Sequence, residues 1–314
     1  MITAEIIDQE TYGSIFREYA ICFDDIRFHQ TVENRVDELW YVLFRKENKN
    51  RAGAIFGRKG NELKLHYSAP FGMIEVVKDH LKIEEYEEIV MAMEKLAQEH
   101  NIESIFYRFP PAFYKANEIN KLTNVLMRQG YDVEEADLNY ALETKSGDAF
   151  IENLQRNARK NLNIALKNNL CLYQCSTVEE KEEAYRVIKR NREDKGFPLR
   201  MTWEQVCRTI ECVEADFYHV KLGTDIIAAA MIYRVNPHIV QVVYWGDIRE
   251  YAEYKPINYL SYMLNEIYDK QEVDFIDIGP STEFGVPNYG LCDFKESIGC
   301  RIDVKYTFVK QIRN

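Results

Sequence analysis

The residues best suited to chemistry gather in one stretch near the end of the chain, residues 273–304. An apolar strand pattern, Phe275–Ile278, precedes a polar, glycine-rich loop, a short helix that ends at Gly299, and a final strand. Ligands of α/β sheets bind just beyond strand ends. The polar residues after this strand are therefore site candidates: Asp277, Ser281, Thr282, Asn288, Tyr289 and Lys295.

Two of these candidates have side chains that suit group transfer to an amine. Asp277 can orient an amine or accept its proton, and Lys295 can stabilise an oxyanion or a leaving group. Each also has a purely structural interpretation. Asp277 can hydrogen-bond the loop backbone, and Lys295 can be a solvated lysine on a short helix.

A basic helix precedes this stretch by more than a hundred residues. Residues 154–178 contain no acid, and four cations recur at spacings of three, four and seven, which places them on one helix face. Such a face can bind phosphates of a cofactor, a lipid-linked precursor or a tRNA end, although charge runs are often only solvated surface. The predicted donor or phosphate-binding residues are Arg156, Arg159, Lys160 and Lys167, with a second cluster at Arg190, Arg192 and Lys195.

Aromatic residues around a strand end provide a candidate acceptor pocket. Tyr244 and Trp245 are followed by Gly246, which permits a bulge or a close ligand; the alternatives are core aromatics and a turn glycine. The predicted acceptor-pocket residues are Tyr244, Gly246, Tyr259, Ser281 and Tyr289. The histidines show no metal-ligand spacing, and we expect no metal. No Ser–His–Asp set or Walker loop is visible.

The elements that must position these residues occur twice. Each half is predicted to end β-β-β-α-β-α-β, with longer helices in the second half, one of them spanning residues 149–168. Residues 145–148 read as a linker. We therefore predict an α/β (α+β) chain of two domains, residues 1–147 and 148–314, each with a mixed central sheet flanked by helices.

Composition narrows the function classes. The net charge is −11, and residues 1–150 hold 18 Lys and Arg against 27 Asp and Glu, so −9 falls in the first half and −2 in the remainder. A general nucleic-acid coat is improbable on that balance. The seven cysteines include no CxxC pair, which indicates reduced thiols. With no leader pattern and no apolar run of membrane-spanning length, we expect a cytoplasmic protein without an integral membrane segment.

The element order and several strings resemble the tandem-GNAT acyltransferases, namely the Fem peptidoglycan aminoacyltransferases (FemAB/FemX-like) and their acetyltransferase-like relatives. The resemblance spans almost the whole chain, and its most specific part is the closing Asp-x-Gly … Gly-Leu … Phe-Lys … Gly pattern, in which the family's lysine aligns with Lys295. The matching strings are Arg156–Ala165, Asn191–Pro198, Asp277–Gly279, Tyr289–Gly299, Tyr107–Pro111 and Tyr67–Pro70.

One departure from the family pattern leaves two functional expectations open. The glycine-rich loop that binds coenzyme A pyrophosphate in most GNAT domains is missing before the pivot helix in both halves, at residues 247–256 and 69–74. The resemblance implies an acyl- or aminoacyltransferase, active in the second domain beside a degenerate first domain. It would use acyl-CoA or aminoacyl-tRNA as co-substrate, with no tightly bound cofactor and a small-molecule or cell-wall-precursor acceptor. tRNA is not favoured by the net charge. The alternative is a non-catalytic ligand-binding protein that retains the fold.

Overall fold

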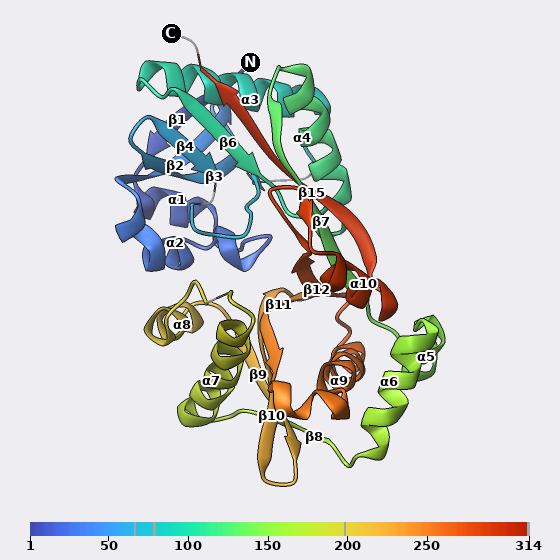
Figure 1. Cartoon of the computed structure of the whole chain (residues 1–314). Coiled ribbons are helices and arrows are strands. Elements are labelled where there is room, and N and C mark those ends of the chain that lie inside the picture. The colour runs from blue at the N-terminus through green and yellow to red at the C-terminus, as the bar shows by residue number, and fades with distance from the viewer. Residues whose placement is uncertain (66, 78–79, 198, 313–314) are drawn as a thin grey trace. The chain divides into compact units, whose positions relative to one another are not determined.

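The structure, a computed structural model, describes residues 1–65, 67–77, 80–197 and 199–312 (Figure 1). The chain forms two compact units: unit 1, of residues 1–137 and 303–314, and unit 2, of residues 138–302. Pro198, the last residue of one family-like string, lies outside the described residues. The boundary predicted at 147/148 differs from this division because residues 139–143 pair with a strand of unit 2.

The elements follow the predicted order in both halves. Those of the first half are β1 (Ile2–Ile7), α1 (Gln9–Ile15), η1 (Cys22–Asp24), α2 (Ile26–Val32), η2 (Glu33–Arg35), β2 (Glu38–Lys46), β3 (Lys49–Lys59), β4 (Glu62–Leu65), β5 (Glu75–Val76), α3 (Ile83–Glu99), β6 (Ser104–Arg108), η3 (Ala112–Tyr114), α4 (Ala116–Arg128) and β7 (Asp132–Glu143). Those of the second half are α5 (Gly147–Asn153), α6 (Arg156–Lys167), β8 (Cys171–Gln174), α7 (Val178–Asp194), α8 (Trp203–Ile210), β9 (Ala215–Leu222), β10 (Asp225–Asn236), β11 (Ile239–Asp247), η4 (Arg249–Tyr254), α9 (Pro256–Lys270), β12 (Phe275–Pro280), β13 (Thr282–Glu283), β14 (Val286–Pro287), α10 (Tyr289–Ser297) and β15 (Arg301–Gln311).

The two units build their sheets on the same plan. In unit 1 the strand order is β1-β2-β3-β4-β6-β15, and in unit 2 it is β8-β9-β10-β11-β12-β7. Every neighbouring pair is antiparallel except one in each unit, β4–β6 and β11–β12. The mixed α/β architecture of two repeated sheets flanked by helices is therefore confirmed.

The last strand of each sheet comes from the other half of the chain. The β15 strand follows all of unit 2 in sequence, yet it pairs with β6 of unit 1, in the register Phe308↔Tyr107. The β7 strand closes the first half, yet it pairs with β12 of unit 2, in the register Ile276↔Leu142. Each sheet is thus completed by a strand that a simple cut between two tandem domains would remove.

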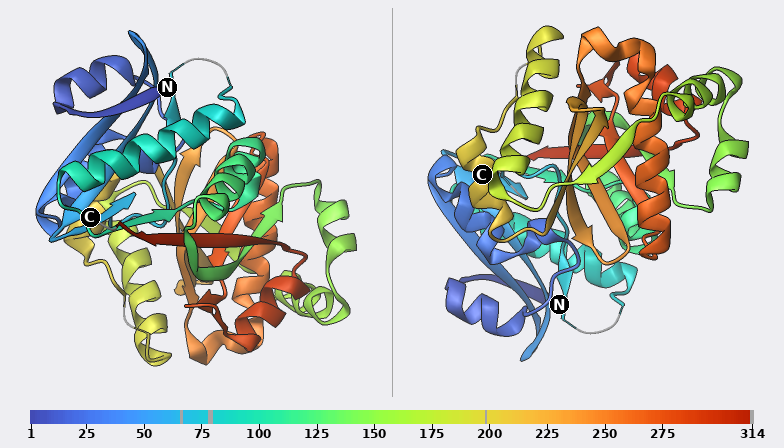
Figure 2. Two further views of the ribbon diagram at one scale, coloured as in Figure 1. Left: turned by 90° about the horizontal axis from the view of Figure 1, so that it is seen from above. Right: turned by 90° about the horizontal axis from the view of Figure 1, so that it is seen from below.

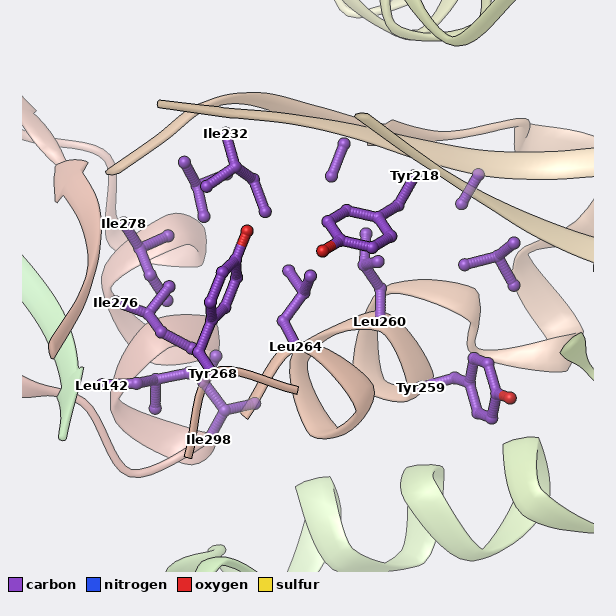
Figure 3. Close-up of a cluster of buried hydrophobic side chains, with 14 of the residues drawn as sticks. Leu142, Tyr218, Ile232, Tyr259, Leu260, Leu264, Tyr268, Ile276, Ile278 and Ile298 are labelled. Atoms are coloured by element: carbon purple, nitrogen blue, oxygen red, sulfur yellow. The ribbon is translucent and has the colours of Figure 1, made fainter. Parts of the chain in front are cut away.

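Helices cover both faces of the unit 2 sheet. Figure 2 shows α7 on one side of strands β9–β11 and α9 on the other. The α9 side is the main core, in which Leu264 and Tyr268 of α9 point toward Tyr218 and Ile232 of the strands (Figure 3). Tyr268 is fully buried and its hydroxyl donates to Asp216 Oδ2 at 2.9 Å, so the packing also satisfies the polar end of this side chain.

Local sequence explains where several of these helices begin. Thr177 caps α7, and Glu180 reaches back to the Thr177 N–H, which makes a capping box. The prediction of a single helix over residues 149–168 is wrong. The segment breaks into α5 and α6 because Leu154 adopts an extended conformation to enter the core, while the Gln155 N–H donates to the Ser297 carbonyl at 2.9 Å.

Unit 1 buries two carboxyl groups side by side. Asp24 and Glu75 hydrogen-bond each other, Asp24 Oδ1 accepts from the Met73 N–H at 3.2 Å, and Glu75 Oε1 accepts from the Ala20 N–H at 2.8 Å. Burial raises the pKa of Asp24 to about 7. Burial and the neighbouring Asp24 charge raise the pKa of Glu75 well above its usual range.

Candidate functional site

The β11 and β12 strands of unit 2 form a fork. Their parallel pairing is Ile239↔Phe275, Val240↔Ile276 and Gln241↔Asp277, and among the described residues it ends there. The β11 strand nevertheless runs to Asp247, whereas β12 stays paired with β7 on its other edge. Residues 242–246 therefore present backbone groups on the edge that faces away from β10.

A bulge accompanies the divergence. On β10, Met231 pairs with Tyr244 and the next residue, Ile232, pairs with Val242, so Val243 is the extra residue of β11. Bulges bend a strand and increase its local twist. The bulge at Val243 lies two residues beyond Gln241, the last residue of β11 that pairs with β12.

A buried polar network ties the fork at its branch point. Asp277 Oδ1 accepts from Asn139 Nδ2 at 2.7 Å and from the Gly279 N–H at 2.8 Å, and Oδ2 accepts from Gln241 Nε2 at 3.0 Å. Asp277 is 0% exposed. Because Ile276 and Ile278 belong to the α9-side core, strand alternation places Asp277 on the opposite, α7 face.

Lys295 holds β12 from α10. Its Nζ donates to the carbonyls of Ile278 at 3.0 Å, Gly279 at 2.9 Å and Pro280 at 3.1 Å, and it lies 5.3 Å from the centre of the Tyr140 ring. The positive φ of Gly279, 73°, and the bulge beside it let three successive carbonyls converge. The three carbonyls offer one acceptor for each N–H group of the ammonium. This geometry favours a structural role for Lys295, and its catalytic role stays a prediction.

The loop after β12 is tied to β7. The Ser281 N–H donates to the Leu138 carbonyl at 3.0 Å, and Thr282 Oγ1 accepts from the Leu138 N–H at 2.9 Å. Asn288 caps α10 by accepting from the Leu291 N–H. The predicted site loop is therefore a fixed hairpin, β13–β14, at the end of β12.

The predicted acceptor-pocket residues lie in different environments. Tyr244 is half-buried and hydrogen-bonds the backbone of Arg200, whereas Tyr259 is a core residue on the α9 side beside Leu172 (Figure 3). Tyr289 is 76% exposed and Ser281 is buried. The structure does not bring these side chains together as one pocket.

Gly246 is close to protein atoms. A Cβ at this position would lie 2.7 Å from Asn191 Cβ, and Asn191 Nδ2 donates to the Asp247 carbonyl at 2.6 Å. The predicted close approach is thus made by α7, which packs against the end of β11. This contact holds the far end of the diverging part of β11.

The basic face of α6 does form an open pocket. It has a volume of about 510 Å³ and is lined by Leu154, Arg156, Arg159, Lys160, Asn163, Ile164 and Lys167. Among the described residues, no carboxylate lies within ion-pair distance of the four cations of this pocket, which are Arg156, Arg159, Lys160 and Lys167. Arg159 donates to the carbonyls of Glu152 and Leu154, which orients its guanidinium. The structure therefore assembles these predicted phosphate-binding cations in one place.

The second basic cluster has protein partners instead. Arg190 pairs with Glu250, and Arg192 donates to the Phe197 carbonyl at 3.0 Å while lying over the Phe197 ring. Lys195 pairs with Asp247 at 3.8 Å. The Arg190 and Lys195 pairs hold the end of α7 against η4 and the end of β11, and Arg192 binds the turn after α7, which are structural roles.

The segment between β11 and α9 offers little to a pyrophosphate. It folds as η4, in which the Tyr251 N–H donates to Ile248 and the Lys255 N–H to Ala252. The first helical residue of α9 is Pro256, which has no N–H. The glycine loop missing from the sequence is thus replaced by a turn that satisfies its own N–H groups.

The Cys300 thiol is not activated. Burial raises the pKa of Cys300 to about 12, with Lys295 acting in the opposite direction. Within the described part of the chain, no group of three His, Cys, Asp or Glu side chains is arranged to hold a metal ion. No helix in that same part has the length and apolar character needed to cross a bilayer.

The repeated sheets and the fork define a tandem GNAT fold, so the predicted fold resemblance is confirmed. FemX has a TM-score of 0.71 at 12% identity, covering 98% of this chain and 97% of FemX. L-PGS from Bacillus licheniformis has 0.59 at 12%, covering 99% and 94%. A tandem GNAT protein from the clavulanic acid biosynthesis pathway has 0.55 at 8%, covering 100% and 99%. No protein-family model and no curated protein sequence matches the chain.

Proposed function

We propose that this chain transfers an acyl or aminoacyl group from an activated donor to an amine at the β11–β12 fork of unit 2. The observation that carries the proposal is the fork itself. Those backbone N–H groups of residues 242–246 that point away from β10 can hold the donor carbonyl as charge develops on its oxygen. The fold shared with FemX and with the tandem GNAT protein supports a transferase of this class.

The reaction would be direct transfer. The amine nitrogen forms a bond to the donor carbonyl carbon, the thiolate or alkoxide of the donor leaves, and the proton lost from the amine neutralises that leaving group. Positioning of the two reactants can supply much of the rate. A covalent enzyme intermediate is not part of this proposal, which agrees with the raised pKa of Cys300.

The α6 pocket is the proposed phosphate site of the donor. Arg156, Arg159 and Lys160 line it without acidic partners among the described residues, and guanidinium groups bind phosphates in charge-assisted pairs. Acyl-CoA and aminoacyl-tRNA both carry phosphates. A small-molecule or cell-wall-precursor amine is the proposed acceptor, and the cytoplasm is the proposed location.

The test combines binding with product detection. The protein is incubated with acyl-CoA species or aminoacyl-tRNA and a panel of amines, and N-acylated products are sought by mass spectrometry. Replacing Arg156 and Lys160 by Gln should weaken donor binding by about tenfold or more at low salt and flatten its salt dependence. The matched control replaces Arg186 and Lys189 by Gln, two exposed cations of α7 that pair within their own helix.

A second function has its own supporting observation. Asp277 and the Lys295 ammonium are both engaged with protein groups, and η4 replaces the pyrophosphate loop. These features suit a protein that binds a ligand without turning it over. Donor binding that depends on α6 but gives no product with any amine would favour this non-catalytic alternative over the transferase.

A further inference from the structure

We infer that Asn139 and Gln241 are positioning residues that act through Asp277 to fix the point where β11 and β12 part. The inference rests on the proposed function, because it assigns these residues to the fork that would hold the donor. It also changes the interpretation of Asp277, which becomes the branch-point pin of the fork instead of a base.

The side chains of this network connect three adjacent strands, in addition to the backbone pairing of those strands. Asn139 lies on β7, Asp277 on β12 and Gln241 on β11, and their exposed fractions are 1%, 0% and 7%. Both carboxylate oxygens accept hydrogen bonds from these amides. Hydrogen bonds to a buried carboxylate are strong, and the group is costly to bury without them. The three side chains therefore act as one unit.

The position of the network coincides with the end of the ladder. Gln241↔Asp277 is the last parallel pair, and these two residues are the ones whose side chains are bonded. Asp277 Oδ1 also accepts from the Gly279 N–H, which belongs to the bulge that follows. The carboxylate thus bonds to both sides of the branch point, the last closed pair and the first residues of the turn.

A parallel ladder does not itself require a buried acid. The equivalent ladder of unit 1, Glu62↔Ser104, Leu63↔Ile105 and Lys64↔Phe106, is built without one. In unit 2 the acid occupies a site where an apolar pair would fill the sheet. Its location at the branch point indicates that it determines geometry there, because a displacement of a reacting group by about 1 Å can lower a rate by about a hundredfold.

The direction of each hydrogen bond provides a sharp test. Asp277→Asn would remove the buried charge and require the Gln241 amide to turn its oxygen toward position 277, which displaces its Nε2 donor, and Gln241→Glu would place two carboxylates in contact. The double variant, Asp277→Asn with Gln241→Glu, restores one donor and one acceptor with the charge moved to β11. We expect kcat/KM for transfer to fall at least tenfold in each single variant and to recover to within about threefold of wild type in the double variant.

A catalytic base at position 277 would not be rescued by a carboxylate at position 241. A folded double variant that remains as impaired as Asp277→Asn would therefore overturn the inference. Hydrogen exchange of the amides of residues 242–246 is measured on the same four proteins without any donor. Faster exchange in both single variants and near-normal exchange in the double variant is expected, and identical exchange in all four would overturn it.

A further variant and the exchange measurements cover the cases in which the charged variants do not fold or wild type gives no product. Gln241→Met removes only one donor, and we expect a threefold to tenfold loss of kcat/KM together with faster exchange at residues 242–246. Unchanged values of both would overturn the inference even if the charged variants failed to fold. If wild type gives no product with any donor, the proposed function fails, while the exchange measurements still decide whether the network holds the fork.

Discussion

The two parallel junctions of the molecule, β4–β6 in unit 1 and β11–β12 in unit 2, differ in the residue types that they pair. Among the described residues each has three residue pairs. In unit 1 the third described pair is Lys64↔Phe106, with Lys64 Nζ 4.4 Å from the ring centre. In unit 2 the third pair is Gln241↔Asp277, and β11 continues to Asp247. The same repeated plan thus places a cation over a ring in one unit and a buried amide–carboxylate pair in the other.

The largest expected effect concerns Lys295, whose ammonium binds three successive carbonyls at the end of β12. Lys295→Met leaves three buried carbonyls without their donor, so we expect unit 2 to lose about 3 kcal/mol of stability. Chemical denaturation, with hydrogen exchange to resolve the two units, measures it. Lys270→Met, at a lysine that is 76% exposed, serves as the control and should change little. Unchanged stability with lost transfer would instead support a catalytic Lys295.

The buried acids of the two units differ in their hydrogen-bonding partners. Asp277 receives amide donors, whereas Asp24 shares its site with Glu75, beside Lys115, Tyr12 and Tyr19. Because the folded pKa of Asp24 is raised to about 7, its contribution to stability is fully present below the ordinary value near pH 4 and is lost as the pH rises through about 7.

The corresponding variant is Asp24→Asn, which keeps an oxygen for the Met73 N–H and cannot ionise. We expect the stability of unit 1 in wild type, relative to this variant, to fall by at least about 1 kcal/mol between pH 5 and pH 8. Thermal unfolding across this pH range provides the measurement. Parallel pH profiles for the two proteins would show that the carboxyl pair does not titrate there.

The smallest expected effect concerns the β4–β6 junction of unit 1. Lys64→Met removes a cation above the Phe106 ring and an ion pair with Glu62, both partly exposed, so we expect a loss of no more than about 1 kcal/mol. Urea unfolding is sufficient to measure it. A loss as large as that of Lys295→Met would mean that the two junctions are equally demanding and would break the comparison.

The helices and strands were predictable because the sequence patterns that define them involve residues close together in the chain. Alternation in β9–β11, the capping box at Thr177 and Pro256 at the start of α9 each depend on neighbours a few residues away. The α6 cations were also predicted, since helical spacing alone places them on one face. What that spacing could not give was the break at Leu154, which depends on a core built from distant strands.

The fork network could not be recognised from sequence. Gln241 is a polar residue within an apolar strand and Asn139 is one of several polar residues of β7, and their common partner is 36 and 138 positions away. Lys295 was identified by type and position, yet its role depends on a bulge that turns three carbonyls toward it. Only the assembled sheet distinguishes a reactive side chain from one that is fully engaged.

The crossed closing strands have a consequence for how the protein is made. A ribosome releases β1–β6 early, but β15, which pairs with β6, leaves it only after every residue of unit 2. The first half of the chain therefore waits with an open sheet edge while the second half is translated, and such edges are sites of mispairing. Truncation after α10 would leave β6 permanently without that partner, so we expect nascent chains to need protection until translation has passed β15.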